Sequence, residues 1–151
     1  MVRATIYARP YRPGDAERFA ARADMASEKA AVDWDWEAGA PPGTRTLVRF
    51  PGEVIGLGGA IDAGGGVFQA WACLAPVPRG DWPLLFGCAN AVLNEAELRR
   101  GARRIVALVR TDWDAARRTL ERLGFSRSAE TSQWEGFSVM AREAPRGEKN
   151  R

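Results

Sequence analysis

The segment from residue 67 to residue 110 places a strand pattern, a helix pattern and a second strand pattern in direct succession. Residues 67–74 (VFQAWACL) and 104–110 (RIVALVR) are short apolar runs, and the first predicts a strand buried on both faces. Between them we expect a helix that starts after the N-cap residue Asp81 and ends before Gly101. Its apolar stripe consists of Leu85, Ala89, Val92, Leu93 and Ala96. A β-α-β unit of this kind predicts two neighbouring parallel strands.

Residues 44–50, 53–61 and 67–74 are expected strands joined by tight turns, and they predict an antiparallel meander. Residues 4–11 are a further expected strand, which Pro10 places at a sheet edge. Asp15 is the expected N-cap of a helix that ends before Trp34.

The segments after the unit predict a second helix and a hairpin. Thr111 or Asp112 is the expected N-cap of the helix, and Gly124 its C-terminal glycine. Residues 126–131 and 137–142 then form the expected hairpin.

The resulting order is β-α-β-β-β-α-β-α-β-β, with no repeat and no linker. It predicts a single α+β domain with a mixed central sheet flanked by helices. We expect the domain to cover residues 1–143 and residues 144–151 to form a flexible C-terminal tail.

The residue types exclude several kinds of chemistry. The chain has no histidine, so histidine general bases, Ser-His-Asp and Cys-His machinery and histidine-ligated zinc are excluded. Cys73 and Cys88 are too few for a thiolate zinc site and are expected to be buried free thiols. We therefore predict no metal site.

The charge and hydropathy patterns bound the partners and the location. The net charge is only +3, and the arginines alternate with acids, as in residues 117–122. Because nucleic-acid binders carry a larger clustered excess, nucleic acid is not an expected partner. No run reaches the roughly 18 apolar residues that span a membrane, and residues 1–15 lack the apolar core of a signal peptide. We expect a cytoplasmic protein with no membrane partner.

Two segments carry a resemblance to a known family. Residues 102–125, ARRIVALVRTDWDAARRTLERLGF, resemble the fifth strand and fourth helix of the GNAT (N-acetyltransferase-like) superfamily, and residues 11–15 (YRPGD) resemble the start of many members. The element order is similar too. The resemblance implies the GNAT fold, with the strands at 67–74 and 104–110 separating at their C-terminal ends, and acetyl-CoA as co-substrate.

The loop that binds the CoA pyrophosphate in this family departs from its pattern. Family members have Q/R-x-x-G-x-G/A there, because glycines let the phosphates approach backbone N–H groups at a helix N-terminus. Here residues 79–84 are RGDWPL. Trp82 and Leu84 occupy the small positions, Pro83 lacks an N–H group, and Asp81 adds a negative charge. If acyl-CoA binds, the resemblance assigns it to Leu74, Arg79, Gly80 and Trp82.

The catalytic positions of the family are also altered. The resemblance implies a tyrosine general acid where the chain has Leu120, and an asparagine where it has Trp113. Tyr7 and Tyr11 are the only tyrosines, and neither lies at that position. We therefore predict no catalytic residue.

The remaining polar clusters have structural explanations beside functional ones. Glu53 and Asp62 flank the third strand and are expected to be solvated turn carboxylates rather than a general base. Residues 33–37 (DWDWE) are either a helix end with two aromatic anchors or a site for a cationic amine. Residues 56–59 (GLGG) lie within a strand pattern with no helix after it, so they predict bulge or close-packing glycines rather than a dinucleotide loop.

Three hypotheses remain for the function. The first is a GNAT-like protein with a degraded acyl-CoA site and no cofactor, which acts by contacting other proteins. The chain is similar to GNAT-like proteins of tailed phages and prophages in Trp71, the Pro/Arg-rich loop 76–79 and the R-x-L-x-x-L-G-F pattern of residues 118–125, which implies virion components as partners and a place in the particle. The second is a divergent N-acyltransferase that uses acetyl-CoA on an amine. The third is an unrelated α+β binding domain.

Overall fold

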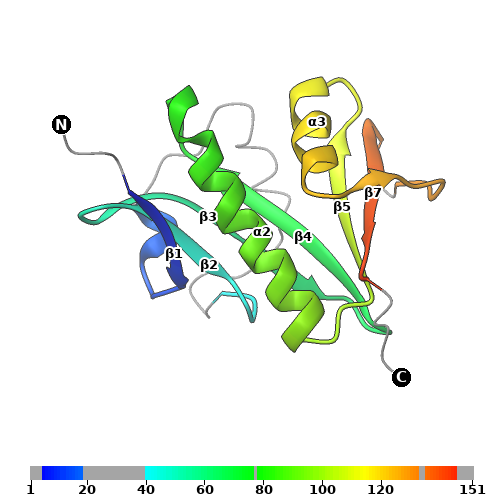
Figure 1. Ribbon diagram of the computed structural model, residues 1–151, viewed down its shortest axis with the longest axis horizontal. Helices are drawn as coiled ribbons and strands as arrows, with labels where there is room; N and C mark the ends of the chain where they lie inside the picture. Colours follow the sequence, from blue (N-terminus) through cyan, green and yellow to red (C-terminus); the bar gives the residue numbers. More distant parts are fainter. Residues whose placement is uncertain (1–4, 19–39, 77, 133–134, 146–151) are drawn as a thin grey trace. The chain divides into compact units, whose positions relative to one another are not determined.

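The computed structural model describes residues 5–18, 40–76, 78–132 and 135–145. Seven strands form one mixed sheet in the order β1-β2-β3-β4-β5-β7-β6 (Figure 1). In chain order the elements are β1 (Ile6–Pro10), the 3₁₀ helix η1 (Asp15–Glu17), β2 (Arg45–Arg49), β3 (Glu53–Asp62), β4 (Val67–Leu74), the 3₁₀ helix η2 (Arg79–Asp81), α2 (Trp82–Arg99), β5 (Arg104–Arg110), α3 (Asp114–Arg122), β6 (Ser126–Arg127) and β7 (Phe137–Glu143). The predicted single-domain α+β class is confirmed.

The chain divides into two compact units. One contains Met1–Ile61 with Trp71–Val92, and the other contains Asp62–Ala70 with Leu93–Arg151. In the first unit β1 pairs with β2, and β2 with β3, both antiparallel. The β2–β3 part of the predicted meander is confirmed, β4 is the next strand of the sheet, and β1 lies at the sheet edge as expected.

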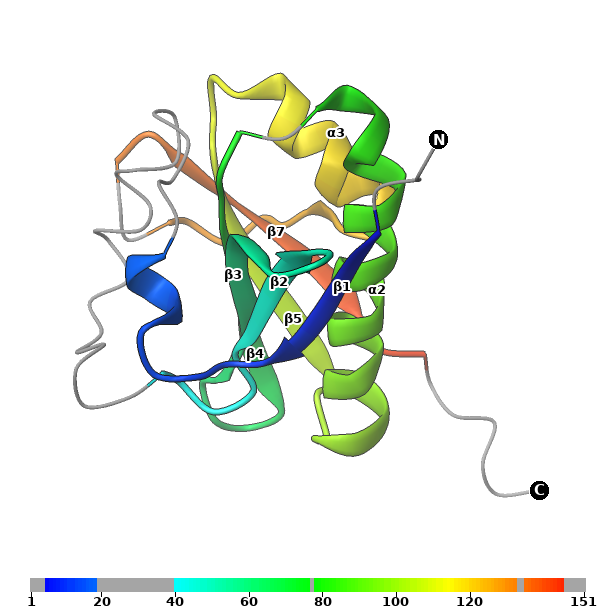
Figure 2. The ribbon, with the colours of Figure 1, turned by 90° about the vertical axis from the view of Figure 1, so that its left-hand side faces the viewer.

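Two apolar clusters cover the strands of the first unit from opposite sides. Figure 2 shows η1 on one side of β1–β3 and α2 on the other. The cluster with Ala16 of η1 also contains Val54, Leu57 and Cys73. The cluster with Leu85 of α2 also contains Ile6, Ile55 and Leu74. Neighbouring residues of β3 and of β4 therefore contribute to different clusters, as the pleat of a strand requires.

Gly56 lies beside a β-bulge in β3 and close to the backbone of β4. Leu47 pairs with Gly56 but Val48 pairs with Val54, so Ile55 is an extra residue. A Cβ on Gly56 would lie 2.7 Å from Leu74 Cδ2 and 2.8 Å from the carbonyl oxygen of Cys73. The backbone of β4 thus passes too close for a side chain, which confirms the prediction of a close-packing glycine.

Asp15 forms the polar centre of the first unit. The prediction that it caps a helix is wrong, because Gly14 holds the N-cap of η1 with no side-chain cap bond. Asp15 is fully buried. Its carboxylate accepts hydrogen bonds from the Arg9 guanidinium at 2.7 and 3.0 Å and from the hydroxyl of Thr46 at 2.7 Å. The backbone N–H of Arg12 donates a further bond at 2.8 Å. A buried carboxylate needs such partners, and a helix end alone does not supply them.

The expected helix after Asp15 and the tail beyond residue 145 fall on undescribed parts of the chain. Residues 19–39 lie outside the described residues, as do residues 146–151. The assigned domain limits of 1–143 and 144–151 remain a prediction.

The second unit contains the parallel pair. The first half of β4 pairs with β5 in parallel, from Val67 with Arg104 to Ala70 with Ala107. The pairing ends there, although β4 continues to Leu74 and β5 to Arg110. The resemblance implies such a separation of the two strands at their C-terminal ends. One detail is wrong: Gln69 and Ala72 are exposed, so β4 is not buried on both faces.

The final hairpin is confirmed but is shorter than predicted. β5 pairs with β7 along its whole length, and the two residues of β6 pair with Ala141 and Met140 of β7. Arg142 of β7 donates hydrogen bonds to Glu97 at 2.9 and 3.1 Å, to Asn94 at 2.7 Å and to the Leu123 carbonyl at 3.0 Å. The half-buried guanidinium of Arg142 thus links β7 to the last turns of α2 and to the end of α3.

The start of α3 differs from the prediction, whereas its end agrees. Trp113 is the N-cap and makes no side-chain cap bond. The hydroxyl of Thr111 instead donates to the carbonyl of Gly136, so the expected cap at Thr111 or Asp112 is wrong. At the other end Gly124 has φ 89°. Hydrogen bonds from Phe125 to Leu120 and from Gly124 to Glu121, each 3.0 Å, form a Schellman end.

Gly56→Ala is expected to lower the free energy of unfolding by about 1–3 kcal/mol, because the added methyl group overlaps backbone that cannot yield. Gly52→Ala is the matched control, since a Cβ on Gly52 meets nothing within 4 Å. Urea denaturation of both variants is the measurement. A loss of equal size in the two would contradict the close approach of β3 and β4.

Asp15→Asn is expected to lower the free energy of unfolding at pH 7 by about 2 kcal/mol. Burial raises the pKa of Asp15, but the hydrogen bonds from Arg9, Thr46 and the Arg12 backbone, together with the charge of Arg9, lower it to about 2. Because the folded pKa lies below the unfolded value, this stabilisation is complete above the ordinary pKa of 3.8 and is lost as pH falls through about 2.

Urea denaturation of the wild type and the variant at several pH values tests this. The difference between them should shrink between pH 4 and pH 2. The exposed Glu17→Gln is the control and should show no comparable difference. An Asp15→Asn deficit of the same size at pH 2 and at pH 7 would contradict the role of the ionised carboxylate.

Candidate functional site

The candidate site is the turn between β4 and α2, which we call the β4–α2 turn and define as residues 78–84. Pro78 precedes η2, and its carbonyl accepts a hydrogen bond of 3.0 Å from the N–H of Asp81. The N–H of Trp82 donates to the carbonyl of Arg79. Pro83 has no N–H group. Three consecutive residues at the start of α2 therefore offer no free backbone donor.

This arrangement does not fit a pyrophosphate in the manner of the GNAT glycine loop. Such a loop binds the anion through backbone N–H groups that are left free at a helix N-terminus. Here a 3₁₀ turn uses two of those groups internally, and proline removes a third. A pyrophosphate at this turn would find the N–H groups of Asp81 and Trp82 already bonded and none on Pro83.

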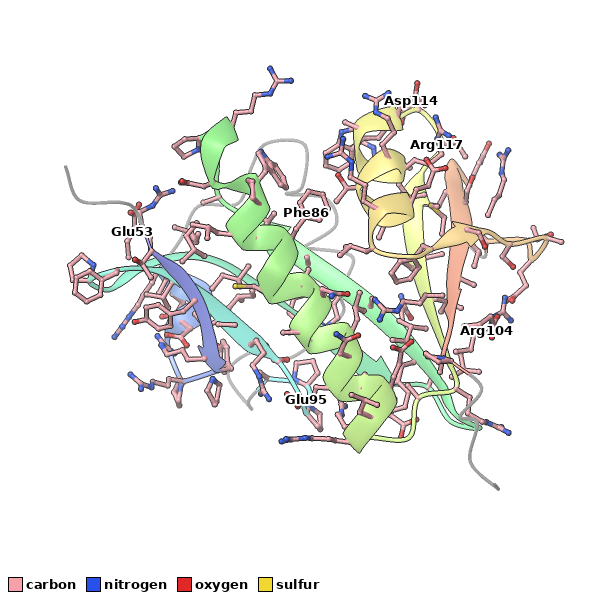
Figure 3. All side chains as sticks on the ribbon, viewed as in Figure 1. Glu53, Phe86, Glu95, Arg104, Asp114 and Arg117 are labelled. Carbon is pink, nitrogen blue, oxygen red and sulfur yellow. The ribbon has the colours of Figure 1, made fainter. Side chains whose placement is uncertain are left out.

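The carboxylate of Asp81 is directed into the protein. Its Oδ2 lies 2.6 Å from Nη1 of Arg49, and the side chains are only 12% and 21% exposed. The contact is an ion pair without aligned hydrogen-bond geometry. Arg49 also lies 3.4 Å from the carboxylate of Glu53 at the start of β3 (Figure 3). The negative charge that Asp81 adds at the turn is therefore compensated by Arg49.

The four residues assigned to acyl-CoA by the resemblance lie in two environments. Leu74 is buried in the cluster with Leu85, and Trp82 packs against the same cluster. Arg79 and Gly80 are exposed on η2. The bulk of Trp82 thus serves the core, and only Leu84, 41% exposed, presents a large side chain at the surface of the first helical turn.

The other candidate carboxylates and tyrosines have structural roles. Asp62 accepts a 2.8 Å hydrogen bond from the N–H of Gly64 and so closes the turn after β3. The hydroxyl of Tyr11 accepts one of 3.4 Å from the N–H of Ala16, while Tyr7 is 38% exposed on β1.

The cysteines and other clusters add no reactive centre. Cys73 is buried, and burial raises the pKa of the Cys88 thiol, which disfavours the nucleophilic thiolate. Among the described residues no group of three or more His, Cys, Asp or Glu could hold a metal ion. Their helices include none that is both long and apolar enough to cross a membrane. The acidic and aromatic cluster 33–37 lies outside the described residues.

Sequence reasoning missed two partly buried ion pairs of the first unit. Arg9 with Asp15 and Arg49 with Asp81 join residues whose separation in sequence gives no pattern. The available signal was the alternation in residues 44–50, which places Arg45 and Arg49 on one face of a strand, but it does not identify their partners.

A double-mutant cycle on Arg49→Gln and Asp81→Asn is expected to give a coupling free energy of about 1–3 kcal/mol, since both groups are largely removed from water. The control cycle uses Arg117 and Asp114 on α3 (Figure 3), which are 48% and 68% exposed, and should give less than about 0.5 kcal/mol. Chemical denaturation of the wild type and the six variants supplies both values. Equal coupling in the two cycles would contradict a buried pair at the β4–α2 turn.

Comparison with known proteins identifies the fold. No family model matches the chain, and no curated protein matches it. Solved structures do. A GNAT-family acetyltransferase from Bacillus anthracis matches with a TM-score of 0.69 and 12% identity over 95% of this chain and 98% of that one. Ard1 from Thermoplasma volcanium matches with a TM-score of 0.65 and 18% identity over 93% and 98%.

A third structure is a chimera of the spermidine N-acetyltransferase SpeG from Vibrio cholerae and hSSAT. It matches with a TM-score of 0.65 and 14% identity over 93% of this chain and 96% of that one. Identities this low establish the fold alone. The chain adopts the fold of the GNAT acetyltransferases.

Proposed function

We propose that this protein is a GNAT-fold domain that has lost acetyl-CoA-dependent transfer and acts by binding other proteins. The observation that carries the proposal is the β4–α2 turn, in which the N–H groups of Asp81 and Trp82 are bonded internally and Pro83 has none. Hydrogen bonds to charged groups contribute roughly 1.5–3 kcal/mol each, so the loss of several donors removes most of the affinity for a pyrophosphate.

Two residues of the α3 region, Leu120 and Trp113, support the same proposal. Leu120 cannot protonate a departing thiolate, and Trp113 occupies the N-cap with its ring beside the Arg110 guanidinium, 5.7 Å from the ring centroid. Three parts of the family's site are therefore altered together, namely the pyrophosphate loop, the tyrosine position at Leu120 and the asparagine position at Trp113. Loss of all three is expected if selection maintains the fold of the domain and no longer maintains the acetyl-transfer reaction.

The proposed partners are virion components of a tailed phage or prophage. This part rests on the resemblance of Trp71, the loop 76–79 and residues 118–125 to GNAT-like proteins of such phages. Co-sedimentation of the tagged chain with particles from an induced culture tests it. A chain that stays wholly in the particle-free fraction would contradict it.

A divergent acetyl-CoA-dependent N-acyltransferase is the second candidate. It is favoured by the acetyltransferase folds that match the chain and by Arg79, whose exposed side chain at the turn could pair with a phosphate. In that case Arg79→Ala should weaken acetyl-CoA binding at least tenfold.

Calorimetric titration with acetyl-CoA separates the two candidates. We expect no binding tighter than about 1 mM, because Asp81, Trp82 and Pro83 offer the anion no backbone N–H group. A GNAT enzyme with an intact glycine loop, titrated in the same buffer, is the positive control. A dissociation constant in the low micromolar range, abolished by excess desulfo-CoA, would overturn the proposal and establish the second candidate.

A further inference from the structure

The connection from α2 to β5 carries a dense run of arginines, and we call it the basic connection. It consists of residues 98–104 (LRRGARR), which contain four arginines and no acid and belong to the second unit. Arg104 (Figure 3) forms ion pairs with Glu130 and Glu143, so its charge is compensated within the unit. The other three arginines remain as the cations of this connection.

Two of these three side chains are held against the fold. The guanidinium of Arg100 lies over the ring of Phe68, 4.9 Å from its centroid. Arg103 Nη2 donates a 2.6 Å hydrogen bond to the carbonyl of Gly65. A Cβ on Gly66 would lie only 2.5 Å from Arg103 Nε, so glycine at that position lets the arginine lie across the turn. Side chains that are already held lose less conformational entropy when they bind a ligand.

Arg99 and Arg103 carry charge that the second unit does not compensate. Both are exposed, and neither forms an ion pair with a described residue. The bond to Gly65 uses only one of the five N–H groups of the Arg103 guanidinium. The dipole of α2 favours a cation in its last turn, which explains Arg99 but not Arg103, because Arg103 lies beyond the end of the helix.

Leu98 adds an apolar side chain beside these arginines. It is 83% exposed, more than any other large hydrophobic residue that the structure describes, and it directly precedes Arg99. An exposed leucine is ordinary by itself, but this one lies next to cations without acidic partners. A ligand that fits both features carries carboxylates around an aliphatic group.

We propose that the basic connection binds an acidic segment of a partner protein, rich in Asp and Glu and carrying an aliphatic side chain. Guanidinium groups bind carboxylates through paired hydrogen bonds, and arginine clusters recognise acidic motifs in this way. The proposal rests on the proposed function in one respect, namely that the partner is a protein. It does not depend on the loss of acetyl transfer, because the β4–α2 turn precedes α2 whereas Arg99 ends it.

Two other kinds of polyanion fit this surface less well. A nucleic acid binds a wider basic surface, whereas Arg104 is paired with two glutamates and Asp62 is exposed at the start of the turn that contains Gly65. The nucleic-acid backbone also offers no aliphatic partner to Leu98. A helix that binds a membrane surface presents a whole apolar face to the lipid, and one leucine does not form such a face.

Fluorescence anisotropy with a labelled synthetic peptide of repeated Glu-Glu-Leu units tests the proposal at low salt. We expect saturable binding to the full chain, and binding weaker by roughly fivefold or more in Arg99→Glu, because a repulsion replaces an attraction. Arg118→Glu is the matched control. Arg118 is an exposed arginine of α3 without an ion pair to a described residue, and this variant has the same net charge and should bind like the wild type.

Leu98→Gln tests the apolar part of the surface and leaves its charge unchanged. This variant should bind the Glu-Glu-Leu peptide more weakly than the wild type does. Its binding of a peptide of repeated Glu-Glu-Gln units should equal that of the wild type, because that peptide has no aliphatic group for Leu98 to contact. Equal binding of the Glu-Glu-Leu peptide by Leu98→Gln and the wild type would contradict the aliphatic contact.

A wild type that binds no Glu-Glu-Leu peptide up to about 1 mM would overturn the proposal. So would an equal loss in Arg99→Glu and Arg118→Glu, or tighter binding to a DNA duplex of the same charge or to phosphatidylglycerol vesicles. The acetyl-CoA titration reports separately on the proposed function. Micromolar binding of acetyl-CoA together with intact peptide binding would contradict the loss of acetyl transfer and leave this surface established.

Discussion

The hydrogen bonds that close the β4–α2 turn determine how the start of α2 packs on the strands of the first unit. The bonds from Asp81 to Pro78 and from Trp82 to Arg79 bring α2 directly out of η2. This directs Trp82 onto the cluster over β1–β3 and Asp81 toward Arg49 of β2. The same bonds occupy the N–H groups of Asp81 and Trp82 inside the turn.

Most of the fold could be predicted because it depends on local periodicity. The strand at 104–110 alternates buried and half-buried residues, and Gly101 and Gly124 end their helices with positive φ. The helix N-termini were predicted less well. By residue type, good caps are Asp15, Thr111 and Asp112, but two of them form tertiary hydrogen bonds instead. Arg9 and Thr46 bind Asp15, and Gly136 binds Thr111.

The candidate site was predictable in part. The substitutions at residues 82–84 are visible in the sequence, but the mechanism by which they act is not. Trp82 and Asp81 were expected to obstruct and repel a ligand. In the structure the partly buried Trp82 packs against the cluster with Leu85, and Asp81 pairs with Arg49. Long-range pairing of this kind depends on the registration of β2 against α2, for which a single sequence contains no periodic signal.

The most direct test of the central claim follows the backbone amides of the turn by NMR in ¹⁵N-labelled protein. On titration with desulfo-CoA to millimolar concentration, the amide signals of Arg79, Asp81 and Trp82 should stay unshifted, and those of Asp81 and Trp82 should exchange slowly with solvent. Saturable shifts at these amides, with a loss of their internal protection, would show that the turn opens to receive a pyrophosphate and would contradict a closed turn.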